Sequence, residues 1–162
     1  MIKWIANKII QLCEKYGRYY HILGRPDDAT DIYLIRYFVF RSRFFNIYLH
    51  RFLRSDADDL HDHPWYFWTM MIQGAYNEIS PQGITLRTIK GNKYKFMAPT
   101  HLHSVKVLKD RTYEERDKAP LTLCITGPIQ REWGFVQLVK NQYEWIPWHK
   151  YLNKPEDERP YE

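Results

Sequence analysis

Four of the seven histidines in this chain stand in two closely spaced pairs, His61 with His63 in LHDHPW and His101 with His103 in APTHLHSV. Side chains two residues apart on a β-strand point to the same face, so each pair would present two imidazole rings together. Two such rings, with a third from a neighbouring strand, can surround one ion, and imidazole suits Fe, Zn, Cu and Ni. Three protein ligands leave a position for water or substrate, which is typical of catalytic metal sites.

An ordinary role is the alternative, because a histidine with a hydrogen-bond partner needs no metal ion. One HxH pair alone would favour that ordinary role. Two pairs about forty residues apart, each at the start of an apolar β-type segment, favour a metal site. The other three histidines are isolated, and we expect structural roles for His21, His50 and His149.

The residues that follow the first pair indicate what surrounds the site. The alternation that turns His61 and His63 inward also turns Trp65 and Phe67 inward, so the pocket near the histidines would be aromatic. Tyr76 could supply a hydroxyl group to this pocket. An anionic substrate would need a cation, and the guanidinium fork matches carboxylate and phosphate groups. The candidates for that role are Arg131, Arg54 and Arg87.

The elements that must position these residues are mostly short strands. Apolar residues recur at helical spacing between residues 2 and 16, which predicts an amphipathic helix that packs on the main body. Its apolar residues are Ile2, Ile5, Ile9, Leu12, Cys13 and Tyr16. After the turn-forming GRPDDATD, short β-type segments separated by turn signals predict an all-β sandwich or barrel. The segments are 32–40, 47–55, 65–72, 75–80, 84–90, 93–99, 103–108, 121–127 and 133–139.

Composition indicates one folded domain. The chain has 162 residues, of which 44% are hydrophobic and 17% aromatic. Its net charge of +5 is uneven: residues 1–54 carry +6 and the rest −1. The basic region could meet an anionic partner, but a solvated surface is the simpler interpretation, and no specific nucleic-acid motif is present. The two cysteines, Cys13 and Cys124, form no CxxC pair, so we expect a reducing cytoplasm. We see no signal-peptide pattern and no membrane span.

Two stretches resemble the cupin superfamily. HDHPWYFWTMMIQG resembles the first cupin motif, with its HxH pair and its closing Gly74, and KFMAPTHLHSV resembles the second, with Pro99 before a histidine. More narrowly, RSDADDLHDHPW, APTHLHSV and ITGPIQREWGF are similar to small bacterial and phage cupins with an HDHPW motif. The resemblance covers roughly residues 33–140. It implies a double-stranded β-helix, the cupin jelly-roll barrel, at residues 25–152. A helix and connector (1–24) would pack on it, and a polar tail (153–162) would follow.

The sequence departs from the cupin motifs at two places. The glutamate of the first motif would fall at Phe67 or Trp68, so that carboxylate ligand is missing. The second motif lacks its glycine, since His101 stands there. Cupins without the glutamate include three-histidine thiol dioxygenases and proteins that bind no metal. His101 is an alternate ligand or a group that supports one.

The resemblance implies that His61, His63 and His103 would hold one divalent transition metal, with Fe first and Ni, Zn or Mn as alternatives. A carboxylate could still come from elsewhere, and Asp59 and Asp62 are the nearest in sequence. Strand alternation turns Asp62 away from the histidine face, which fits a supporting role better than ligation.

Three functions follow as hypotheses. The first is a mononuclear metal cupin, an Fe(II)-type dioxygenase or related metalloenzyme, that acts on a small polar or anionic molecule. The second is a metal-independent sugar-nucleotide isomerase or epimerase, in which a histidine serves as base and a tyrosine as acid. The third is a cupin that binds a small molecule and carries out no reaction. Cupins often pair through their sheets, so we expect a homodimer.

Overall fold

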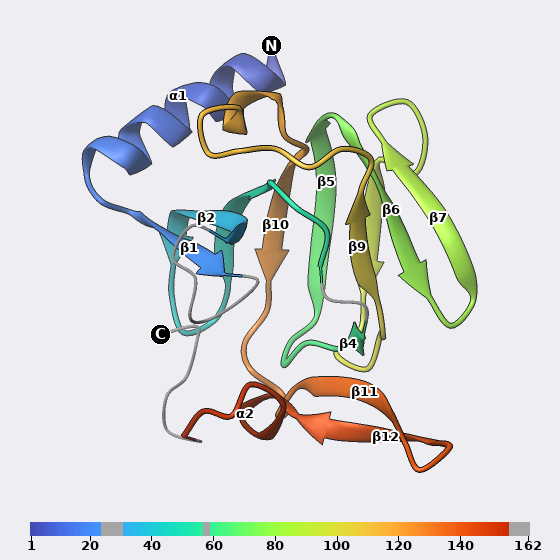
Figure 1. Ribbon diagram of the computed structural model, residues 1–162. Helices are drawn as coiled ribbons and strands as arrows, with labels where there is room; N and C mark the ends of the chain where they lie inside the picture. Colours follow the sequence, from blue (N-terminus) through green and yellow to red (C-terminus); the bar gives the residue numbers. More distant parts are fainter. Residues whose placement is uncertain (24–30, 57–58, 156–162) are drawn as a thin grey trace.

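The computed structural model describes residues 1–23, 31–56 and 59–155, and it shows a β-rich fold with one helix at its N-terminus (Figure 1). The helices are α1 (Ile2–Lys15), the 3-10 helix η1 (Arg116–Lys118) and α2 (Trp148–Tyr151). The strands are β1 (Tyr19–Leu23), β2 (Ile32–Arg41), β3 (Asn46–Phe52), β4 (Leu60–His61), β5 (Phe67–Gln73), β6 (Ala75–Ser80), β7 (Gly83–Thr88), β8 (Tyr94–Met97), β9 (Ser104–Val107), β10 (Leu121–Thr126), β11 (Gly134–Val139) and β12 (Gln142–Pro147). The predicted fold class is therefore confirmed.

The strands form three sheets, and their pairs are antiparallel. The large sheet has the order β1-β2-β3-β10-β5-β8, and the two smaller ones have the orders β12-β11-β4 and β7-β6-β9. The two smaller sheets are joined by a single bridge. His61, in the two-residue strand β4, pairs with His103, which directly precedes β9. The described strands therefore form a jelly roll whose three sheets do not close into one continuous barrel.

The predicted N-terminal helix is confirmed, but the face that it buries differs from the predicted one. It packs on the large sheet through Ala6, Ile10 and Cys13, which follow the i, i+4, i+7 spacing of one helix stripe. Ile5 and Leu12, which the periodicity placed on the packing face, are exposed. The helix offers two apolar stripes, and only contact with the sheet decides which of them is buried.

Two strands lie where none was expected. Residues 19–23, assigned to a connector, form β1 and pair with β2 in the large sheet. Residues 142–147 form β12, which pairs with β11 in a hairpin at the opposite end of the molecule from α1 (Figure 1). The predicted turn at 24–31 falls almost entirely, and the predicted tail at 153–162 largely, outside the described residues.

The inner faces of the strands enclose an aromatic core next to the histidines. Trp65 and Phe67 are buried, as predicted, and pack with Tyr48, Met97 and Cys124. Among the described residues, no helix is long and apolar enough to cross a bilayer.

The helix contact can be tested with two substitutions on α1. Ile10→Ala should lower the free energy of unfolding by about 2–4 kcal/mol, because Ile10 is only 4% exposed in the core. Leu12→Ala should change it by no more than about 0.5 kcal/mol, because Leu12 is 55% exposed. Urea unfolding followed by circular dichroism measures both. If Leu12→Ala lowered the free energy of unfolding more than Ile10→Ala, the helix would pack through its other stripe.

Candidate metal centre

Backbone hydrogen bonds bring the two HxH segments together. The N–H of His61 donates to the carbonyl of His103 at 3.0 Å, and the N–H of His103 donates to the carbonyl of His61 at 2.9 Å. Residues that exchange both bonds face each other directly in an antiparallel pair and carry their side chains on one face. The N–H of His63 donates to the carbonyl of Pro99 at 3.2 Å. The polypeptide backbone thus ties both segments together on either side of the histidine cluster.

The three rings of His61, His63 and His103 form a compact group. Their centroids lie 5.0 to 5.1 Å apart in all three pairs. The Nε2 atoms of His63 and His103 are 2.9 Å apart, and one ligand atom from each of the three residues lies within 4.8 Å of the others. If two nitrogens each lie about 2.1 Å from one ion and the angle between them at the ion is a right angle, they are about 3.0 Å apart. The observed spacing therefore fits a shared ion.

Two carboxylates lie behind these rings, and sequence reasoning identified neither. Asp56 Oδ2 is 3.2 Å from His61 Nδ1, and Glu78 Oε1 is 3.3 Å from His103 Nδ1. Both contacts have ion-pair distances but depart from hydrogen-bond geometry at the ring nitrogen. A carboxylate beside Nδ1 orients the ring and leaves Nε2 for the opposite side, an arrangement common behind metal-bound histidines. The only signal in the sequence was their position: Asp56 stands in RSDADDLHDHPW, and Glu78 stands in the β-type segment 75–80.

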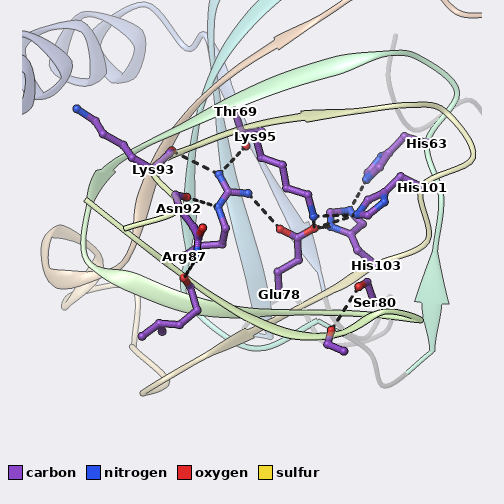
Figure 2. A network of polar contacts seen from close by, with 12 residues as sticks. His63, Thr69, Glu78, Ser80, Arg87, Asn92, Lys93, Lys95, His101 and His103 are labelled. Carbon is purple, nitrogen blue, oxygen red and sulfur yellow. Dashed lines mark hydrogen bonds and ion pairs between the residues drawn. The ribbon is translucent and has the colours of Figure 1, made fainter. Parts of the chain in front are cut away.

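Glu78 is the centre of a network of charged groups (Figure 2). Its side chain is 1% exposed, and it contacts both arginine and lysine: Arg87 Nη1 lies 3.1 Å from Oε2, and Lys95 Nζ contacts Oε1. His101 Nε2 lies 3.1 Å from Oε1. Burial alone would raise the pKa of Glu78, but its contacts with His101, His103 and Lys95 outweigh burial and hold the pKa far below its usual range. Glu78 is therefore a buried carboxylate that stays ionised.

The pKa values of two of the clustered histidines are lowered. Burial is the main cause for His63, and the neighbouring His61 and His103 lower its pKa further. For His103, burial also lowers the pKa and outweighs Glu78, which acts in the opposite direction. Both rings are therefore neutral near pH 7. A neutral imidazole has a nitrogen lone pair available, which is the form that binds metal ions.

Two groups of residues could hold an ion, and they share one histidine. The first is His61, His63 and His103, and the second is Glu78, His101 and His103. The first group has only imidazole donors, and it is the group that the sequence predicts. The ring of Phe67 lies beside it, with its centroid 4.6 Å from that of His63. The three imidazole donors of the first group fit a divalent transition metal.

The carboxylates nearest in sequence to the first pair hold other parts of the fold. Asp62 is buried; its Oδ1 accepts from the N–H of Gly134 at 2.8 Å, and its Oδ2 accepts from Trp145 Nε1 at 3.0 Å and from Arg131. Asp59 Oδ2 accepts from Gln137 and from the hydroxyl of Tyr151. Neither aspartate belongs to a ligand group among the described residues. The prediction that Asp62 turns away from the histidine face agrees with these contacts.

The three arginines predicted for anion binding are all engaged in ion pairs within the protein. Arg87 pairs with Glu78, Arg54 with Asp31, and Arg131 with Asp62. Arg87 is completely buried and also donates to Thr69 and to the backbone, so its guanidinium group is committed to the fold. Anion binding at Arg54 and Arg131 stays a prediction that their ion pairs do not favour.

The remaining candidates lie outside the histidine cluster. Tyr76 packs in a neighbouring apolar cluster, and burial raises the pKa of its hydroxyl group. His50 Nε2 accepts a hydrogen bond from Arg36 Nε at 3.0 Å, which is a structural role. His149 Nδ1 lies 3.0 Å from Glu132, and the ring of His21 packs on that of Tyr113.

Comparison with solved structures identifies the fold. No protein-family model matches the sequence, and no curated protein matches it. The polyketide cyclase RemF from Streptomyces resistomycificus is 12% identical, with a TM-score of 0.53 over 84% of this chain and 87% of that chain. A cupin 2 conserved barrel domain protein from Rhodopseudomonas palustris is 11% identical, with a TM-score of 0.52 over 71% and 74%. Rru_A2000 from Rhodospirillum rubrum, a cupin-2 domain, is 11% identical, with a TM-score of 0.50 over 71% and 72%.

These neighbours show that the chain has the fold of cupin-2 domains. At such low identity the likeness concerns the fold alone. The chemistry of the site has to be argued from its own residues.

The loop that carries the first pair depends on a close approach at Gly134. A Cβ atom there would lie 2.2 Å from the carbonyl oxygen of Ile146, and the N–H of Gly134 is bonded to Asp62. Gly134→Ala should therefore lower the free energy of unfolding by about 1–3 kcal/mol. Gly91→Ala is the control, because its Cβ would meet nothing nearer than 3.7 Å. Equal thermal shifts for both variants would contradict this explanation.

Proposed function

We propose that the chain is a mononuclear metalloprotein of the three-histidine kind, which binds one divalent transition metal through His61, His63 and His103. The observation that supports it most is the 2.9 Å separation of two Nε2 atoms in a cluster of three rings. Asp56 and Glu78 would hold His61 and His103 in the orientation that directs Nε2 to the ion. Three protein ligands would leave positions for a substrate.

The proposed activity is that of an Fe(II)-type dioxygenase acting on a small polar or anionic molecule. When bound, Fe(II) would supply the ability to activate O₂ beside a substrate. The protein would contribute the rings that hold the ion and an aromatic wall, in which Phe67 lies edge-on to His63. Such a wall keeps water away and strengthens electrostatic interactions. Lys95, whose side chain is 27% exposed next to Glu78, is a cation beside the cluster, which supports a polar or anionic substrate.

A cupin that binds a small molecule without metal is a second candidate, and one observation favours it. The 2.9 Å contact between His63 and His103 is also the length of a single N–H···N hydrogen bond between two neutral rings.

The metal-independent isomerase receives less support. That reaction needs a tyrosine hydroxyl as acid. The rings that pack against the three histidines in the described residues include Phe67, Trp133 and Phe135, none of which carries a hydroxyl. The homodimer stays a prediction.

Metal binding can be tested on untagged protein. His63→Ala should weaken Co(II) or Fe(II) binding at least about 100-fold, since loss of a supporting residue alone commonly costs 10–100-fold. His149→Ala should leave binding unchanged, because His149 pairs with Glu132 away from the cluster. Calorimetric titration measures the affinity. Thermal melting provides a second readout, since a bound ion stabilises the wild-type fold. Wild-type protein that binds none of Fe, Ni, Zn, Mn or Cu would exclude the proposal.

Turnover is a separate test. Anaerobically prepared Fe(II)-loaded protein should consume O₂ when given its substrate, and a panel of small thiols and carboxylic acids is the first to try. His61→Ala should abolish the uptake, because the site loses one of its three donors. An oxygen electrode measures the rate, and mass spectrometry with ¹⁸O₂ shows whether both atoms enter the product. Fe(II)-loaded protein that consumes no O₂ with any member would argue against a dioxygenase with these substrates.

A further inference from the structure

The second group of possible ligands, Glu78, His101 and His103, has the composition of a metal site. One ligand atom from each lies within 4.8 Å of the others, and the carboxylate is almost fully buried. His103 takes part in both groups through different atoms: its Nε2 faces His63, and its Nδ1 faces Glu78. Ions in both groups would therefore be bridged by His103, whose ring would lose its N–H proton to solvent and bind through both nitrogens.

A lysine side chain occupies this second group. Lys95 reaches from β8 so that its Nζ contacts Glu78 Oε1 and lies 3.0 Å from His101 Nε2 (Figure 2). Its ammonium group thus contacts two of the three donors that a metal ion would use. Arg87 contacts the other oxygen of the same carboxylate at 3.1 Å. The single negative charge of Glu78 is already opposed by two positive charges, which leaves little attraction for a further cation.

We propose that Lys95 is a built-in cation that keeps this second group closed to metal, so that the chain binds one ion and not a pair linked through His103. The inference rests on the proposed site at His61, His63 and His103. An ammonium group has three N–H donors and no lone pair, so it can bind to the carboxylate and the ring but cannot be a metal ligand. A divalent ion could enter only if Lys95 moved out.

The experiment counts metal ions in variants of the full, untagged chain. Protein is dialysed against Co(II), and the bound metal is measured by elemental analysis and by calorimetric titration. Wild type should hold one ion per chain. Lys95→Leu, which removes the charge without adding a ligand, should hold two, with the second bound at least tenfold more tightly than any second ion in wild type. Lys95→Arg, which keeps the cation, should hold one.

Matched controls separate the charge of Lys95 from general effects. Lys93→Leu makes the same change two residues away, where the ammonium lies over the ring of Tyr94, and it should hold one ion. Lys95→Leu combined with His101→Ala should return to one ion, because the second group loses a donor that the first group does not use. Should Lys95→Leu fold poorly, Lys95→Gln retains a donor for Glu78 without the charge and should also gain the second ion.

The outcome separates this inference from the proposed function. One ion in both wild type and the folded neutral variants would overturn the role of Lys95 and leave the three-histidine site standing. Two ions in wild type would overturn it as well. No ion in wild type but one in Lys95→Leu would support the role of Lys95 and contradict the three-histidine site. His61→Ala removes a donor of the first group only. The double variant His61→Ala, Lys95→Leu should therefore hold one ion, in the second group.

Discussion

The pair of backbone hydrogen bonds between His61 and His103 is the contact on which the candidate site depends. It joins the two smaller sheets at one point. The strand that carries His61, β4, is only two residues long and makes no longer pairing there. The same pairing places two imidazole rings on one face, and His63 follows two residues later. Side-chain geometry is thus set by main-chain hydrogen bonds, which do not depend on a bound ion. A site formed in this way is preorganised before any ligand arrives.

Buried charge is the second constraint. A carboxylate as enclosed as Glu78 is stable only with partners that replace water, and removal of one partner from such a pair commonly costs about 3–5 kcal/mol. That requirement accounts for the convergence of Arg87, Lys95 and His101 on one residue. The cupin motif would have placed a carboxylate at Phe67 or Trp68. In this chain an acidic group comes instead from β6 and lies on the Nδ1 side of His103, while Phe67 packs against the rings.

Several features could be predicted because they depend on local rules. Strand alternation correctly placed Trp65 and Phe67 in the core and turned Asp62 toward other partners. Helical periodicity correctly located α1, yet it could not choose between two apolar stripes, since the choice depends on the sheet beneath. The strand β1 was missed because its residues resemble a connector until β2 is available to pair with them. The anion-binding roles predicted for Arg87 and Arg54 rested on residue type alone, and their carboxylate partners lie 9 and 23 residues away.

The sequence by itself determined the fold class, the course of most strands and the two histidine pairs, because periodicity and HxH spacing are properties of adjacent residues. Only the tertiary structure decided that His101 turns to Glu78 and that Lys95 enters the same group. The physical reason is that these relations are set by strand register and by the pairing of buried charges. Both bring together residues tens of positions apart, and no local pattern in the sequence encodes which of them meet.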